Sequence, residues 1–226
     1  MRTIYFDNIA STNDYLKKLK KPKEDVFVVA KTQDGGRGTK GRSFICSEGG
    51  VYASLLKLYP CKAEESFSIM MCSALAVVKT LHAFDIKAKI KWPNDIIVNG
   101  KKICGILIEN VFEGDMVSRS VIGVGLNVNN DLSDEIKDIA ISCKQVLCKQ
   151  LDVNTVLATL CFNLYLQPDY NEYKKHLLYL GEEVAIFNNK STYKAIIEDI
   201  LPDGRLKLQN GEILSAGEIT IRKNNK

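Results

Sequence analysis

The sequence predicts an α+β protein that ends in a small all-β unit. Before residue 181, short β-branched runs alternate with stretches whose apolar residues recur at helical spacing. From Gly181 onward, short extended segments are separated by turn signals such as Asn210-Gly211. With 226 residues and 46% hydrophobic content, the chain is long enough for one ordinary domain and a small appendage. We therefore expect a first domain at 1–180 and a second at 181–226.

The N-terminal elements are expected to be three extended segments and two helices. The extended segments lie at 1–9, 26–30 and 51–58. The run Ser-Thr-Asn-Asp at 11–14 supplies residues that cap helices, ahead of an amphipathic stretch at 15–19. Apolar residues at helical spacing over 63–84, about six turns, predict a long helix.

A β-hairpin is the firmest local prediction. Extended segments are expected at 89–92, 95–98 and 102–109. Pro93 separates the first two, and Asn99-Gly100 marks a two-residue hairpin turn between the second and the third.

The remaining elements are one strand, two helices and the C-terminal strands. A strand rich in Val and Gly is expected at 121–128, followed by helical stretches at 133–149 and 154–180. The C-terminal strands are expected at 183–187, 193–200, 206–208, 213–215 and 219–222. Short strands with turns between them predict a small barrel.

Composition narrows the functional classes. The formal net charge of +4 comes from well-mixed acidic and basic residues, so nucleic-acid binding is not indicated. The seven cysteines form no C-x-x-C pair, and we expect reduced, structural thiols. We find no signal-like N-terminus and no run of about 18 apolar residues, so a cytoplasmic protein without a membrane span is expected. Only two histidines occur, which gives little support to a metal cluster or a histidine-based triad.

A glycine-rich basic segment is the first candidate for chemistry. Residues 35–42 read GGRGTKGR, so Arg37, Lys40 and Arg42 lie among four glycines. Backbone amides and cations can converge there on an anion without obstruction by Cβ atoms, which favours phosphate binding. The spacing fits neither a P-loop nor a dinucleotide fingerprint, and a solvated flexible loop is the alternative.

A second candidate is the run Lys-Trp-Pro-Asn-Asp at 91–95. It combines the only Trp of the chain with a polar pair, Asn94 and Asp95, expected at the end of a sheet. The alternative is that Trp92 fills the core and the next three residues only turn the chain.

Lys102 shares strand parity with Cys104 and Ile106, so it should point to their side unless a bulge intervenes. An inward lysine needs an anionic partner; alternatively, it extends into water near the hairpin tip. Gly105 marks either close approach of a ligand or a bulge. Asn127 is either an amide that binds ribose or phosphate or an ordinary strand-terminating Asn.

Taken together, these segments resemble the biotin protein ligase family in order and spacing, over essentially all 226 residues. The resemblance rests on 11–13, Gln33, 36–42, 91–95, 102–107 and 123–127. It implies a mixed β-sheet with packed helices, the class II synthetase-like catalytic fold, followed by a small SH3-like barrel.

The resemblance also implies roles for individual residues. Those that would bind the ureido and thiophene end of biotin are Ser11, Thr12, Asn13 and Gln33. Those that would surround its carboxylate are Arg37, Gly38, Thr39, Lys102 and Gly105, with Lys102 and Arg37 catalytic. Those that would bind the nucleotide are Lys40, Arg42, Phe44, Asn94, Asp95 and Asn127. Asp95 would be a Mg²⁺ ligand through water.

The implied reaction uses ATP and biotin and needs no protein nucleophile. The biotin carboxylate attacks the α-phosphate of ATP, giving biotinyl-5'-AMP and pyrophosphate, so the protein has to bring two anions together with Mg²⁺. A lysine of a biotin carboxyl carrier protein, the biotinyl domain of acetyl-CoA carboxylase, then attacks the mixed anhydride, which releases AMP and leaves biotin attached through an amide.

Two departures from the family pattern stand out. The motifs begin at Ser11, which leaves no room for the family's winged helix-turn-helix, so we expect no DNA partner. Thr39 stands where the family loop usually has Arg, and it cannot offer a guanidinium fork to an adenylate. We expect looser retention of biotinyl-AMP.

Two alternatives remain open. Lipoate protein ligase uses a related domain, although the 91–95 run and the terminal barrel favour biotin. A noncatalytic binding module of the same fold is the other, and Lys102 together with the three loop cations argues against it. The oligomeric state, monomer or homodimer, is left open.

Overall fold

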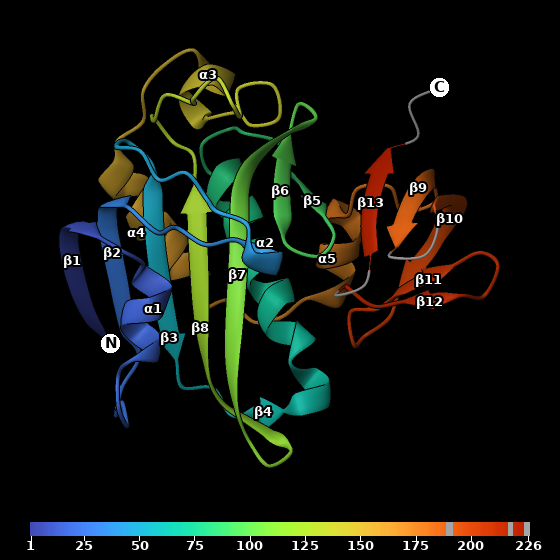
Figure 1. Cartoon of the computed structure of the whole chain (residues 1–226), viewed down its shortest axis with the longest axis horizontal. Coiled ribbons are helices and arrows are strands. Elements are labelled where there is room, and N and C mark those ends of the chain that lie inside the picture. The colour runs from blue at the N-terminus through green and yellow to red at the C-terminus, as the bar shows by residue number, and fades with distance from the viewer. Residues whose placement is uncertain (189–191, 217–218, 224–226) are drawn as a thin grey trace.

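A computed structural model describes residues 1–188, 192–216 and 219–223 (Figure 1). Its larger sheet is mixed: β1 pairs with β2 in parallel, and all its other pairings are antiparallel. The strand order is β1 (Arg2–Ile9), β2 (Val26–Gln33), β3 (Val51–Lys57), β8 (Met116–Leu126), β7 (Lys101–Glu113), β6 (Asp95–Val98) and β5 (Lys89–Lys91), with β4 (Cys61–Lys62) also on β8. The expected mixed sheet is confirmed.

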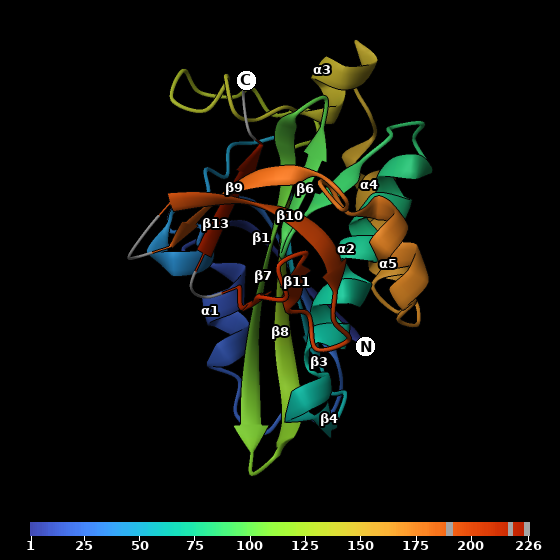
Figure 2. The ribbon, with the colours of Figure 1, turned by 90° about the vertical axis from the view of Figure 1, so that its right-hand side faces the viewer.

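Helices cover the two faces of this sheet unequally (Figures 1 and 2). The long helix α2 (Phe67–His82) and α4 (Val153–Asn163) pack on one face, where Leu55 and Ile106 belong to the main hydrophobic core. The six-residue α1 (Thr12–Lys17) packs on the other face and buries Leu16. Such a short helix covers only part of a sheet face, so polar residues and glycines can occupy the rest.

The helix predictions after residue 132 are partly wrong. Only α3 (Cys143–Leu147) forms within 133–149; the preceding turns end at a backbone exchange in which Lys102 N donates to Ile139 O and Ile141 N donates to Lys102 O, both at 2.9 Å. This exchange with β7 replaces the hydrogen bonds that a helix would have supplied.

The second helical stretch, 154–180, is divided into α4 and α5 (Tyr170–His176). Pro168 lies between them, and proline lacks the backbone N–H and restricts the residue before it, so it ends a helix. Asp169 then caps α5 by accepting from Glu172 N at 2.9 Å.

The hairpin at Asn99-Gly100 is confirmed, with φ of 51° and 76°, the positive values that a tight hairpin turn requires. A register shift follows it: Ile96 is opposite Cys104 but Ile97 is opposite Lys102, so Ile103 is an extra residue in β7.

This bulge reverses the side of Lys102. Its Nζ lies 3.0 Å from the position that a Cβ would take on Gly105. Cys104 and Ile106 lie in the core on the opposite face. The prediction that Lys102 points to the side of Cys104 and Ile106 is therefore wrong, because the bulge that was named as its exception is present.

The C-terminal unit, expected to be a small barrel, is a five-stranded antiparallel sheet, and every predicted strand agrees to within one residue at each end. Its order is β12 (Ile213–Leu214), β11 (Leu206–Leu208), β10 (Thr192–Ile200), β9 (Glu183–Asn188) and β13 (Ile219–Lys223). It lies beyond the β5 edge of the large sheet (Figure 1).

Close contacts join the C-terminal unit to Trp92, between β5 and β6, and to the helices α5 and α2. Trp92 Nε1 donates to Gly204 O at 2.8 Å, and Lys174 pairs with Asp199 at 2.5 Å. Phe67 packs where a Cβ on Gly204 would stand. The main hydrophobic cluster runs through both sheets without a break, so the domain boundary between 180 and 181 stays a prediction. Among the described residues, none of the helices has the length and apolar character needed to cross a membrane.

Candidate active site

A floor of three glycines lies on the α1 face of the large sheet. Gly105 on β7 is the register partner of Gly125 on β8, and Gly123 follows at the same parity. A Cβ on Gly125 would stand 2.7 Å from the ring of Phe44, and a Cβ on Gly123 would meet the side-chain amide of Asn13. These glycines let an aromatic ring and an amide lie directly on the sheet backbone.

Beside this floor runs a chain of buried polar groups. Thr12 N donates to Gln33 Oε1 at 2.7 Å, and Ser54 Oγ donates to Asn13 Oδ1 at 2.6 Å. Thr12 Oγ1 donates to the same Gln33 oxygen at 3.0 Å and lies 2.7 Å from Ser54 Oγ, so the two hydroxyls are in hydrogen-bond contact. Thr12, Asn13 and Ser54 are all at least 95% buried. Such linked groups hold one another in fixed orientations.

Cys46 fixes the far end of Gln33. Gln33 Nε2 donates to Cys46 Sγ at 3.1 Å, and that thiol donates to Phe44 O at 3.3 Å. Burial raises the pKa of the Cys46 thiol to about 11, which keeps its hydrogen in place for this bond.

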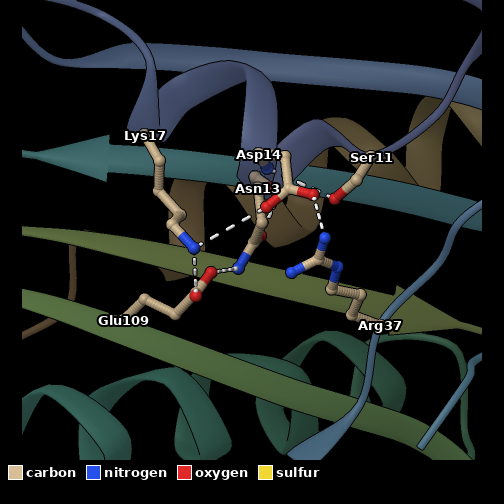
Figure 3. A network of polar contacts seen from close by, with 7 residues as sticks. Ser11, Asn13, Asp14, Lys17, Arg37 and Glu109 are labelled. Carbon is tan, nitrogen blue, oxygen red and sulfur yellow. Dashed lines mark hydrogen bonds and ion pairs between the residues drawn. The ribbon is translucent and has the colours of Figure 1, made fainter. Parts of the chain in front are cut away.

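Charged residues extend the polar chain toward solvent (Figure 3). Asn13 Nδ2 donates to Glu109 Oε2 at 3.0 Å, and Lys17 Nζ pairs with Glu109 Oε1 at 2.6 Å. Asp14 lies 3.6 Å from Lys17 and pairs with Arg37 Nη2 at 2.9 Å. Burial opposes ionisation of Glu109, but hydrogen bonds from Lys17 and Asn13 outweigh it and lower the pKa of that carboxyl.

Lys102 lies on the other side of the glycine floor. Its Nζ pairs with Asp95 Oδ1 at 2.5 Å and lies 5.8 Å from the centre of the Phe44 ring. Asp95 is the register partner of Gly105, which explains why cation, carboxylate and ring converge there. The anionic partner expected for Lys102 is thus Asp95.

The glycine-rich segment folds back on itself. Gly38 N donates to Arg42 O at 2.6 Å, and Phe44 N donates to Gly36 O at 2.9 Å. Thr39 begins a single 3₁₀ turn, Thr39–Gly41, and Arg42 is exposed. The side chain of Lys40 lies outside the described part of the chain, so its predicted contact with nucleotide is untested.

Asn94 and Asn127 serve the framework. Asn94 Nδ2 donates to Ile106 O at 2.8 Å, and Asn127 Nδ2 donates to Ile141 O at 3.3 Å. Both amides are buried and bonded to backbone carbonyls. Their contact with a nucleotide stays a prediction.

Five polar residues of the site escaped sequence reasoning: Asp14, Lys17, Cys46, Ser54 and Glu109. Ser54 lies inside an otherwise apolar strand, and Glu109 shares strand parity with Gly105. A polar residue on a strand that is otherwise buried usually has a specific partner, so these two carried a readable signal.

The fold and the site together define an α+β protein whose large sheet presents buried polar groups and paired cations on one face, followed by a small antiparallel sheet. The solved structure of the biotin protein ligase from Aquifex aeolicus in complex with biotin and ATP has this architecture. It is 26% identical, with a TM-score of 0.81, and the match covers 99% of each chain.

The chain belongs to the biotin/lipoate A/B protein ligase family, whose model matches residues 5–127. The bifunctional ligase/repressor BirA of Bacillus subtilis is 38% identical over 182 residues, which are 76% of this chain and 55% of that protein. BirA of Escherichia coli is 24% identical over 231 residues, covering 95% and 72% respectively. The chain thus spans about half the length of its Bacillus relatives.

Proposed function

We propose that this chain is an ATP-dependent biotin protein ligase. It activates biotin to biotinyl-5'-AMP with release of pyrophosphate, and transfers biotin to a lysine of a carrier protein. The observation that carries the proposal is the glycine floor flanked by Arg37 and Lys102, in a chain whose full length matches a ligase solved with biotin and ATP.

The buried polar chain suits the ureido end of biotin. A ureido group offers two N–H donors and one carbonyl acceptor, so it needs both kinds of partner at fixed positions. Ser11, Thr12, Asn13 and Gln33 supply hydroxyls and amides whose orientations are already set by mutual hydrogen bonds. Preorganised groups of this kind lose little entropy when the ligand binds.

The cations suit the carboxylate end of biotin, where the reaction with ATP takes place. Arg37, Gly38 and Thr39 would cover the biotin carboxylate, with Gly105 below it and Lys102 facing it. Lys102, Arg37, Lys40 and Arg42 would offset the charge that develops on the α-phosphate as the carboxylate attacks. Phe44, Asn94 and Asn127 would line the adenosine side.

Asp95 fits a Mg²⁺ ion only as a minor ligand. Its carboxylate pairs with Lys102, and no group of three His, Cys, Asp or Glu side chains suited to a metal occurs among the described residues. Mg²⁺ commonly keeps several waters and binds through one or two carboxylates plus substrate phosphates. Asp95 would therefore hold the ion through water, and the ion would neutralise phosphate charge.

The proposal extends to partner and setting. The proposed acceptor is the biotin carboxyl carrier domain of acetyl-CoA carboxylase. In support, a ligase of Paracoccus denitrificans that is 31% identical over 105 residues is named for acetyl-CoA carboxylase. All seven cysteines are free thiols, which suits the reducing cytoplasm. Residues 1–180 would form the catalytic domain and 181–226 the C-terminal domain, in a monomer or a homodimer.

Biotin-dependent exchange between ATP and pyrophosphate tests the first step. Exchange with biotin, lost in Lys102→Ala, is the expected result. The matched control is Lys101→Ala, which removes the neighbouring lysine; its Nζ donates to Lys137 O at 2.9 Å, outside the site. Transfer of labelled biotin to a purified carrier domain then tests the second step.

The same assay decides between the alternatives. The family model covers both biotin and lipoate ligases, so exchange with lipoate or octanoate in place of biotin would make the chain a lipoate-type ligase. Absence of exchange with every acid would favour a noncatalytic binding module.

A further inference from the structure

Arg37, the loop cation assigned above to the biotin carboxylate, already has a carboxylate partner. Its Nη2 lies 2.9 Å from Asp14 Oδ2, and Figure 3 shows the loop side chain reaching across to the first turn of α1. The pair is accessible to water, since 24% of the Asp14 side chain and 59% of the Arg37 side chain are exposed. It can therefore open without burying an unpaired charge.

The backbone of Asp14 is anchored beside the chain of buried polar groups. Its backbone N donates to Ser11 Oγ at 3.2 Å, and its neighbours Thr12 and Asn13 are anchored by Gln33 and Ser54. The backbone that carries the Asp14 carboxylate is thus anchored, which keeps this carboxylate within reach of Arg37.

The other nearby cation is committed elsewhere. Lys17 Nζ lies 2.6 Å from Glu109 and 3.6 Å from Asp14. Glu109 itself is fixed by Asn13. Arg37 is therefore the closest cation to Asp14, and the two charges neutralise each other across the entrance to the site.

We propose that Asp14 is a specificity-determining residue that sets the affinity of the site for the substrate carboxylate. An acid that binds through Arg37 has to replace Asp14 or share the guanidinium with it, and the fixed negative charge repels a second carboxylate. Asp14 weakens binding of anionic acids without affecting uncharged analogues. This inference rests on the proposed function, because biotin is the acid that Arg37 would receive.

The test measures equilibrium binding by titration calorimetry with two ligands: biotin, and biotinol, in which an alcohol replaces the carboxylate. Asp14→Asn should bind biotin about two- to fivefold more tightly than the unmodified protein, the range expected for removing one exposed ion pair. Its affinity for biotinol should not change. Asp14→Ala is a second neutral variant, with the same expectation.

Two controls isolate the pair. Asp7→Asn removes the same charge from an exposed ion pair with Lys31, at 2.7 Å, on strands away from the glycine floor, and should leave biotin binding unchanged. In an Arg37→Ala background, Asp14→Asn should lose most of its effect, because the partner for which the ligand competes is gone.

Unchanged or weaker biotin binding in both neutral variants would overturn the inference, as would an equal gain for biotinol. Failure of the unmodified protein to bind biotin or to exchange pyrophosphate would remove the proposed function and the inference together. Exchange by the unmodified protein with no gain in either variant would remove the inference alone.

Discussion

At the scale of single residues, the proposed function makes Thr39 the side chain expected to set how long biotinyl-AMP stays bound. It begins the 3₁₀ turn of the glycine-rich loop, half-buried, and its hydroxyl cannot form the paired hydrogen bonds that a guanidinium makes to a phosphate. Thr39→Arg should slow dissociation of biotinyl-AMP about tenfold, the effect of one added charge-assisted contact.

The dissociation rate can be measured by chasing labelled biotinyl-AMP from the enzyme. Labelling of bystander lysines in a mixture of proteins should fall in parallel. Ser43→Arg adds the same charge at an exposed position at the end of the loop and should leave the rate unchanged. Equal rates for the unmodified protein and Thr39→Arg would contradict the prediction.

Glu109 links the site to pH. The pKa of its carboxyl is lower in the folded state, so its ionised form favours folding. Glu109→Gln should reduce the free energy of unfolding by about 1 kcal/mol at pH 7, a modest value because the side chain is partly exposed. As pH falls from about 5 through the lowered pKa, this difference should disappear.

Urea unfolding of both proteins at pH 7, 5 and 4 checks this sign. Glu113→Gln, at the exposed end of the same strand, serves as the control for loss of one charge. A difference between Glu109→Gln and the unmodified protein that stays constant down to pH 4 would mean that the hydrogen bonds from Asn13 and Lys17 do not depend on ionisation.

Among the elements, β8 carries two glycines with separate roles. Gly125 seats Phe44, and Gly123 seats Asn13. Gly125→Ala should displace the ring and raise KM for ATP about tenfold, with little effect on biotin. Gly123→Ala should displace the side-chain amide of Asn13 and raise KM for biotin, with little effect on KM for ATP. Steady-state pyrophosphate exchange with each substrate varied gives both constants, and equal effects of both variants on both constants would show that the floor acts as one unit.

The hairpin and the strands could be predicted because their signals are local. Asn99-Gly100 dictates a turn with positive φ, and the alternation in the flanking strands follows from it. The side of Lys102 could not be predicted, because one extra residue, Ile103, is absorbed by a bulge, and Gly105 in β7 was compatible with a bulge without fixing its position. A parity argument is only valid up to the nearest bulge.

The prediction of the helices after β8 was partly wrong for a different reason. Apolar spacing over 133–149 is compatible with a helix, but the backbone of Ile139 and Ile141 bonds to Lys102, far away in sequence. Long-range pairing of this kind overrides local propensity. The break at Pro168, in contrast, was readable from the sequence alone.

The site residues that stand in motifs could be predicted, whereas the polar residues on strands signalled only that they have some partner and did not say which one. Ser11, Gln33, Arg37 and Lys102 stand in recognisable segments, whereas Glu109 and Ser54 matter through contacts across the sheet. Cross-strand contacts depend on register, which a single sequence does not state.

At the scale of the whole molecule, the C-terminal unit packs against α2, a helix that covers the large sheet. Gly204 has φ of 86°, and a Cβ there would clash with Phe67. Gly211 also has φ of 86°, but a Cβ there would meet nothing within 4 Å. An alanine would strain the backbone equally at Gly204 and Gly211, and only the one at Gly204 would also contact Phe67.

Gly204→Ala should therefore lower the free energy of unfolding by about 1–3 kcal/mol more than Gly211→Ala, the amount typical of overpacking. Urea unfolding followed by circular dichroism measures both. Equal destabilisation would mean that Phe67 moves aside freely and that the interface between the sheets is loosely packed.

The hydrogen bond between Trp92 and Gly204 has one more consequence. The only indole of the chain is 7% exposed and lies at the junction of the two sheets. Its emission colour therefore reports the polarity of that junction, with no dye or tag attached. If the C-terminal sheet separates while the large sheet stays folded, the emission maximum of Trp92 should shift to longer wavelength before the helical circular dichroism signal is lost. Trp92 is therefore an intrinsic fluorescent probe of the contact between the two parts.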